Sequence, residues 1–156
     1  MCPNSTTFQE GTGAATISSS LLTAPGISHG TQMASIVIST NPAQKTILLR
    51  LVAYNSRGQR MSTTESSLIQ AFRWIVSKRV ELNIGAVAMA QGHHSLSTSK
   101  NYCPRVTVLE KLISDLKLND VPVFFPTGNA GNKSRIDWPA CIPASIAIGA
   151  IDAKGQ

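Results

Sequence analysis

The strongest constraint on the fold is a series of short, largely apolar segments separated by segments of helical periodicity. The apolar segments are rich in β-branched residues and occur at 45–54, 84–90, 121–126 and 145–151. Their apolar residues are continuous rather than alternating, which is typical of strands buried on both faces of a parallel sheet. Because parallel strands need long crossover connections, helices are expected between them. The alternation therefore predicts an α/β fold with a parallel sheet covered by helices.

Three segments around and between these strands have apolar residues at the spacing of an amphipathic helix. The first helix is expected to follow His29, the second to reach about Arg79, and the third to end at residues 119–120. Ser62 and Glu65 have the spacing of a capping box at the start of the second helix. The apolar faces comprise Met33, Ala34, Val37 and Ile38 in the first helix, Leu68, Ile69, Phe72, Ile75 and Val76 in the second, and Leu109, Leu112, Ile113 and Leu116 in the third.

Length and local composition bound the domain organisation. With 156 residues, the chain is long enough for one domain or a large part of one. Residues 1–27 are rich in Gly, Ser, Thr and Pro without a sustained period, so we expect loops there, with a short strand at 14–18. Residues 28–156 hold the predicted helices and main strands and are expected to form the structured part.

The charged residues do not indicate a nucleic-acid partner. The formal net charge is +6, from 14 Lys and Arg against 8 Asp and Glu, but the basic residues are scattered along the chain. No aromatic series accompanies them and no nucleic-acid motif is present. No apolar run approaches the ~20 residues of a membrane-spanning helix, and the first residues lack the basic and apolar regions of a signal peptide. We therefore expect no nucleic-acid partner and no membrane span.

The cysteines and histidines do not indicate a metal site. Cys2, Cys103 and Cys141 are an odd number without a CxxC pair, so one disulfide can form, but its pairing is not readable from the sequence. His93 and His94 lie near Cys103, yet their spacing matches no zinc pattern. Neither GxGxxG nor GxxxxGK[ST] is present, so no nucleotide cofactor is expected.

Candidate functional residues follow the predicted strands and open the first helix. In open α/β sheets, ligands bind beyond the carboxyl ends of the strands, where the sequences QGHHS at 91–95 and PTGNAGN at 126–132 lie. Gly128 and Asn129 are also typical of an ordinary turn, because both residue types tolerate left-handed backbone. At the first helix, His29 is followed at once by a glycine, which lets a second backbone approach closely.

Taken in order, four sequence blocks resemble those of the subtilisin-like serine peptidases, the subtilases. The family's HGTxxA block, which carries the catalytic histidine, is matched by HGTQMA at 29–34. Its cleft-lining strand and its oxyanion-asparagine strand end are similar to AMAQG at 88–92 and TGN at 127–129. Its YPA…VAVGA run is similar to WPA…IAIGA at 138–150. Each block alone is a weak match, but four in the family's order, across residues 28–156, form a specific pattern.

The resemblance implies a fold, an activity and a set of site residues. The implied fold is a subtilisin-like, three-layer, doubly wound parallel sheet of the α/β class, of which this chain holds an incomplete part. The implied activity is that of a serine endopeptidase with an Asp-His-Ser triad, in which His29 is the general base and Asn129 stabilises the oxyanion. The implied substrate is a polypeptide, and the chemistry needs no cofactor or metal. The implied substrate-binding residues are Ala90, Gln91, Gly92, Thr127 and Gly128.

Two further properties are implied by the resemblance alone. The parent fold allows Cys141 to form a disulfide with Cys103. Most family members are exported, which implies an extracellular location, although the chain itself shows no signal peptide.

Two catalytic residues of the family pattern are absent from the chain. Residues 1–28 contain no aspartate, and no Gly-Thr-Ser sequence occurs anywhere. We therefore expect residues 28–156 to be the central part of a catalytic domain whose remainder is missing, and the chain to be inactive alone. One alternative is a non-catalytic, subtilase-like relative that only binds peptides. Another is an unrelated nucleotide-binding α/β domain, which the absence of a phosphate-binding loop disfavours.

Overall fold

The computed structural model describes residues 28–49, 51, 57, 63–93, 103–131, 133–152 and 154. The chain divides into two compact units, Met1–Ser62 and Thr63–Gln156. The loop-rich segment predicted at 1–27, with its strand at 14–18, lies outside the described residues. The domain boundary that we place between residues 27 and 28 therefore stays a prediction.

The first unit contains the predicted helix at the histidine. Helix α1 spans Ser28–Thr40, so it begins one residue before His29 rather than after it. Within it Ala34 is buried, with 7% of its surface exposed, whereas Ile36 is 56% exposed. The helix ends just before Pro42, in keeping with the bias of the residue before a proline against helical backbone.

The strand predicted at 45–54 is not present in the part of this segment that the structure describes. Residues 45–49 and Leu51 belong to no helix or strand, and Ile47, Leu48 and Leu49 are 45%, 59% and 41% exposed. A strand forms only where a neighbour supplies hydrogen bonds along its edge, and the described sheet is built from three other strands. Apolar composition alone is therefore not sufficient to predict a strand.

Helix α2 opens the second unit. It spans Glu65–Lys78, and its N-cap is Thr64, whose hydroxyl accepts a hydrogen bond from the Ser67 backbone N–H at 3.1 Å. The predicted capping box requires Ser62, which lies outside the described residues, and Glu65 at the third helical position. Glu65 is instead the first residue of the helix, and Thr64 has the extended backbone that an N-cap requires. The buried residues of α2 belong to the predicted apolar face and are Leu68, Phe72 and Ile75.

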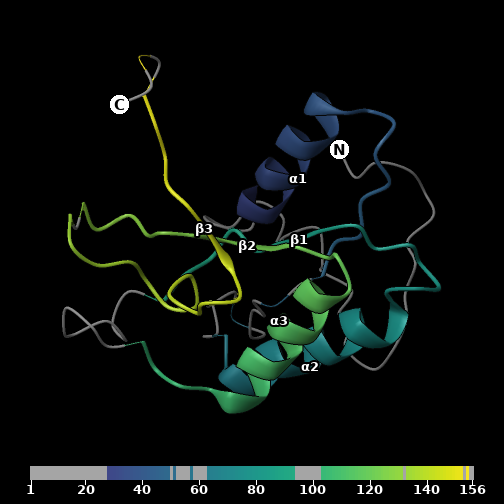
Figure 1. Cartoon of the computed structure of the whole chain (residues 1–156). Coiled ribbons are helices and arrows are strands. Elements are labelled where there is room, and N and C mark those ends of the chain that lie inside the picture. Colours follow the sequence, from purple (N-terminus) through teal and green to yellow (C-terminus); the bar gives the residue numbers. More distant parts are fainter. Residues whose placement is uncertain are drawn as a thin grey trace. The chain divides into compact units, whose positions relative to one another are not determined.

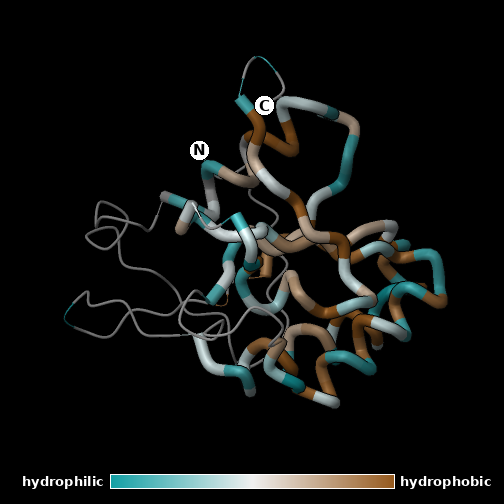
Figure 2. The backbone as a smooth tube through the Cα atoms, turned by 60° about the vertical axis from the view of Figure 1, so that its left-hand side comes forward, coloured by the Kyte–Doolittle hydropathy of each residue, from teal (hydrophilic) through white to brown (hydrophobic). Residues whose placement is uncertain are grey.

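Helix α3 spans Thr107–Leu118 and buries Leu109, Ile113 and Leu116 completely. It ends where the sequence predicts, with Asn119 as C-cap and Asp120 in the left-handed region at φ 57°. The two helices of this unit lie side by side on the sheet (Figure 1), with α3 in contact with the central strand. In Figure 2 hydrophobic and hydrophilic colours alternate along their coils, as expected of amphipathic helices.

The sheet has three parallel strands in the order β1-β2-β3. They span Val87–Ala88, Val123–Pro126 and Ile146–Ile148, so each is shorter than predicted. On β2, the buried side chains of Val123 and Phe125 share the face toward the helices, where the rings of Phe125 and Phe72 are 6.1 Å apart between centroids. The α/β class with a parallel sheet is confirmed.

Strand β3 departs from the predicted burial on both faces. All three of its residues are exposed, and Ile146 and Ile148 keep 43% and 50% of their surface in contact with solvent. Continuous apolar composition predicts burial, but burial needs elements on both faces. Within the described part of this unit, α3 packs on the central strand and α2 packs on α3, and neither helix packs on β3.

A disulfide joins the segment before α3 to the segment before β3. Cys103, ahead of α3, is bonded to Cys141, ahead of β3, with their Cα atoms 5.7 Å apart. This is the pairing that the family resemblance allows. Among the described residues, no helix is long and apolar enough to cross a membrane.

Candidate active site

Two of the predicted substrate-binding segments meet at the carboxyl edge of the sheet. Strands β1 and β2 pair in parallel with Ala88 opposite Phe124, and the pairing continues as the Met89 N–H donates to the Phe124 carbonyl at 3.0 Å. The chain then leaves β1 through residues 90–92 and leaves β2 through residues 127–128. Because the strands are parallel, both exits lie at one edge, where ligands of such sheets bind.

A third segment, residues 137–138, ties these exits together. The Asp137 N–H donates to the Thr127 carbonyl at 2.9 Å, and the His93 N–H donates to the Trp138 carbonyl at 2.7 Å. His93 and Trp138 form an antiparallel bridge. The backbone of Asp137 and Trp138 is therefore hydrogen-bonded to one exit on each side, which holds the two exits at a defined spacing.

The Asp137 side chain lies against the glycines of both exits. A Cβ built on Gly128 would lie 2.5 Å from the Asp137 Cγ and 3.0 Å from its Oδ1, and closer still to its Oδ2. A Cβ on Gly92 would lie 3.2 Å from the Asp137 Cβ and 3.7 Å from its Oδ2. Gly128 also has a φ of 111°, which side chains other than glycine rarely adopt. The two glycines therefore make room for one carboxylate.

Asp137 is a site residue that the sequence analysis did not identify. It precedes the WPA block that matches the family pattern, and it is one of only 8 acidic residues in the chain. An acidic residue directly before a tryptophan was the one feature of the sequence that could have drawn attention to Asp137. It was not sufficient, because nothing in the sequence shows that residue 137 returns to the sheet edge beside residues 92 and 128.

The predicted oxyanion asparagine lies on the loop that follows β2. The loop begins with the Thr127 N–H donating to the Ile148 carbonyl of β3 at 2.9 Å, and the side chain of Asn129 is exposed. A cavity of about 130 Å³ lies inside this loop. Its lining residues are Thr127, Gly128, Ala130, Gly131, Arg135, Ile136 and Asp137.

The predicted catalytic histidine lies in the other unit. His29 is the second residue of α1 and is exposed. It belongs to the unit Met1–Ser62, whereas Asn129 belongs to the unit Thr63–Gln156. The approach of His29 and Asn129 to one groove stays a prediction.

Comparison with known proteins decides the family. A family model described as the subtilase family, peptidase S8, matches residues 21–156. The chain belongs to the subtilase family. Subtilases are serine peptidases, so the resemblance read from the four sequence blocks is confirmed, and the fold of the chain is subtilisin-like.

Two curated subtilisins are similar to this subtilase. They are subtilisin amylosacchariticus from Bacillus subtilis subsp. amylosacchariticus and subtilisin J from Geobacillus stearothermophilus, each 26% identical over 143 residues. The match covers 84% of this chain but 33% of each relative, so the chain spans about a third of their length. A solved structure, the PatG macrocyclase in complex with peptide, is 23% identical, with a TM-score of 0.44 over 62% of this chain and 25% of that one.

The described residues of this subtilase include no group of three or more His, Cys, Asp or Glu side chains that could hold a metal ion. Cys103, the thiol that a zinc site beside His93 would use, is bonded to Cys141. Its sulfur is therefore not a thiolate ligand. His94, the other ligand considered from the sequence, lies outside the described residues.

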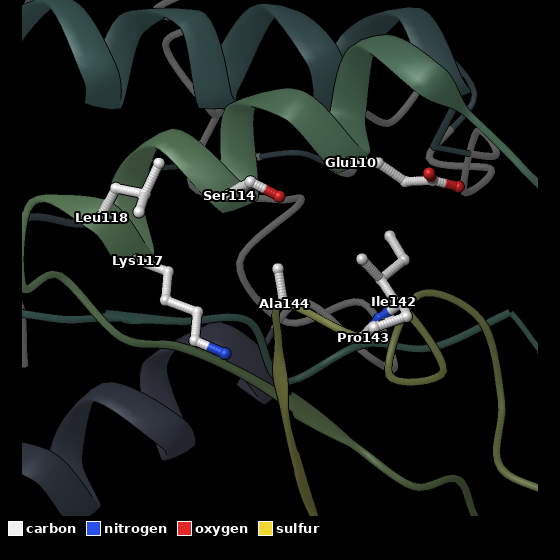
Figure 3. Close-up of a pocket in the computed structure, with 7 residues that line it drawn as sticks. All are labelled: Glu110, Ser114, Lys117, Leu118, Ile142, Pro143 and Ala144. Atoms are coloured by element: carbon white, nitrogen blue, oxygen red, sulfur yellow. The ribbon is translucent and has the colours of Figure 1, made fainter.

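The larger cavity of this subtilase lies away from the candidate site. It has a volume of about 440 Å³ and is lined by one side of α3, with Glu110, Ser114 and Lys117, and by residues 142–144 (Figure 3). Those last residues precede β3, at the amino end of the sheet, whereas the candidate site lies beyond the carboxyl ends. None of the predicted site residues lines this cavity.

Proposed function

We propose that this chain is the central part of the catalytic domain of a serine endopeptidase, with His29 as general base and Asn129 as oxyanion donor. The observation that carries the proposal is the meeting of residues 90–92 and 127–128 at one carboxyl edge of the parallel sheet. Family membership supplies the reaction class. The remainder of the catalytic domain is the partner that the proposal requires.

The proposed chemistry uses two groups of this chain. The neutral imidazole of His29 takes the proton of a serine hydroxyl and passes it to the leaving amine. The Asn129 amide donates a hydrogen bond to the carbonyl oxygen as that oxygen becomes negative. The nucleophilic serine and the aspartate that orients the histidine come from outside residues 28–156 in this proposal, because the chain has no Gly-Thr-Ser sequence.

The proposed substrate site is the pair of strand exits. A peptide bound in extended form pairs with exposed backbone groups as an added strand. Ala90, Gly92 and Asn129 are exposed and Gln91, Thr127 and Gly128 are half-buried, so the exits present backbone to solvent. Glycine at 92 leaves the exposed backbone of that exit without a side chain that would hold a peptide away, whereas at residue 128 the place of a side chain is taken by the Asp137 carboxylate.

The test measures peptidase activity in the full-length protein encoded around this chain, with casein as substrate and a serine-directed inhibitor as control. Exchanging Asn129 for alanine is expected to lower kcat by ~10²–10³, the loss that the corresponding asparagine gives in a subtilisin. Exchanging His29 for alanine is expected to lower it by up to ~10⁶. Gln70→Ala, on the exposed side of α2, is the matched control and should leave kcat unchanged.

Two results would contradict the proposal. One is casein cleavage that survives His29→Ala, because the general base would then be another group. The other is a full-length protein that binds peptides but cleaves none, which would favour the non-catalytic relative.

A further inference from the structure

We propose that Asp137 makes this site select a cationic side chain, lysine or arginine, in the bound peptide. The inference rests on the proposed function in one respect, that a peptide lies along residues 90–92 and 127–128. It goes further by naming the class of residue that the site prefers. The Asp137 side chain lies beside Gly92 of one exit and Gly128 of the other.

The position of the carboxylate is set by backbone contacts on both sides. The Asp137 N–H is bonded to the Thr127 carbonyl, and the next carbonyl, of Trp138, accepts from the His93 N–H. Trp138 is buried, with 6% of its surface exposed, while Asp137 itself is half-buried. Because the backbone of Asp137 is held by these hydrogen bonds, its side chain stays beside the two glycines. A peptide bound over the glycines would therefore lie next to its carboxylate.

The space beside the carboxylate suits a small cation. The cavity lined by Thr127, Gly128 and Asp137 has a volume of about 130 Å³. Since a water molecule takes up ~30 Å³ of liquid, this is room for a guanidinium or ammonium group and its nearest methylenes. A carboxylate pairs with such groups through short, charge-assisted hydrogen bonds, two at once in the case of arginine.

Arg135 lines the same cavity, so its guanidinium can compete with a cationic side chain of the peptide for the Asp137 carboxylate. Both Arg135 and Asp137 take part in interactions within the chain, so an incoming cation joins or replaces contacts that already exist. A carboxylate has about four acceptor positions on its two oxygens, which allows this sharing. The heavy atoms nearest to a Cβ placed at Gly128 all belong to the Asp137 side chain, and the nearest to one placed at Gly92 is the Asp137 Cβ. This favours a cationic over an anionic ligand.

The experiment compares three peptides that differ in one residue. Acetyl-Ala-Ala-X-amide peptides with a fluorescent label and X as Arg, Leu or Glu are titrated against the same full-length protein that is assayed for casein cleavage, and binding is followed by fluorescence anisotropy. We expect the Arg peptide to bind at least about tenfold more tightly than the Leu peptide, as a hydrogen-bonded charge pair typically allows. The Glu peptide is expected to bind most weakly.

Two variants separate selectivity from a structural role. Asp137→Asn keeps the shape against Gly128 and should remove the preference for Arg while leaving Leu binding unchanged. Arg135→Gln removes the competing cation and should increase the preference for Arg. A residue with only a structural role would weaken all three peptides together, so equal losses in Asp137→Asn would overturn the inference.

The outcomes also distinguish this inference from the proposed function. Arg-selective binding by a full-length protein that cleaves nothing would support the inference and contradict the peptidase. Cleavage of casein together with equal binding of the three peptides would support the peptidase and contradict the inference. Preference for the Glu peptide would assign the cavity to Arg135 instead, and failure of all three peptides to bind would overturn the inference as well.

Discussion

At the scale of single residues, Gly128 is the most tightly enclosed of the glycines that the structure describes. Its φ of 111° lies outside the region open to other residues, and a Cβ at this position would meet the Asp137 carboxylate. Gly131 offers a comparison, because its φ of 61° is also positive but nothing lies within 4 Å of a Cβ built there. The pair separates backbone strain from steric collision.

We therefore expect Gly128→Ala to lower the free energy of unfolding by about 2–4 kcal/mol, from strain and crowding together. Gly131→Ala should cost about 1 kcal/mol, from strain alone. Urea denaturation followed by circular dichroism measures both. In an Asp137→Ala background the cost of Gly128→Ala should fall, since the collision is removed, but stay above that of Gly131→Ala, since a φ of 111° is more strained than one of 61°. An unchanged cost in that background would show that Asp137 does not crowd residue 128.

At the scale of elements, the disulfide is a covalent constraint on how the parts of the second unit are held. Cys103 and Cys141 are 38 residues apart in sequence, and the loop they close contains α3, β2 and the strand exit at residues 127–128. The bond therefore joins the start of α3 to the segment that follows Asp137 and Trp138. It stabilises chiefly by restricting the unfolded chain.

Replacing both cysteines of this pair by serine is expected to lower the free energy of unfolding by about 4 kcal/mol, the loop-closure value for this length. Cys2→Ser is the matched control, because both partners of the Cys103–Cys141 bond are already assigned. Guanidinium denaturation in the presence and absence of a reducing agent measures the difference. Reduction should bring the wild type to the stability of the double variant, and equal midpoints for all samples would contradict the expectation.

At the scale of the whole molecule, the proposal makes this chain one part of a larger catalytic domain. It spans about a third of the curated subtilisins that it matches, by their 33% coverage. It carries the histidine and asparagine blocks of the family but no Gly-Thr-Ser sequence. Acyl transfer by this family requires a serine nucleophile, and losing it costs ~10⁶ in rate in subtilisin.

We expect the purified polypeptide 1–156 to release no fragments from casein above the rate of a blank. The measurement is a casein assay at neutral pH, with a complete subtilisin as positive control. Cleavage by residues 1–156 that a serine-directed inhibitor blocks would show that another serine of this chain acts as nucleophile.

Local sequence was sufficient to predict the helices and the parallel direction of the strands. The apolar residues of α2 and α3 repeat at helical spacing, so their buried faces and the end of α3 at Asn119 could be predicted from neighbours a few positions apart. The strand exits at residues 90–92 and 127–128 could be predicted too, because the carboxyl ends of successive parallel strands lie at one edge. The family blocks at those exits pointed to the same edge.

Only the tertiary structure decided which residues lie between those exits. Asp137 is nine positions beyond Gly128 but 45 beyond Gly92, and its contact with both depends on the path of the chain between β2 and β3. Composition predicted burial for residues 45–49 and for β3, whereas the structure leaves both exposed. Periodicity shows only which face of an element is apolar. Contacts between distant segments depend on hydrogen bonds such as that from the Asp137 N–H to the Thr127 carbonyl, and no local sequence pattern predicts these.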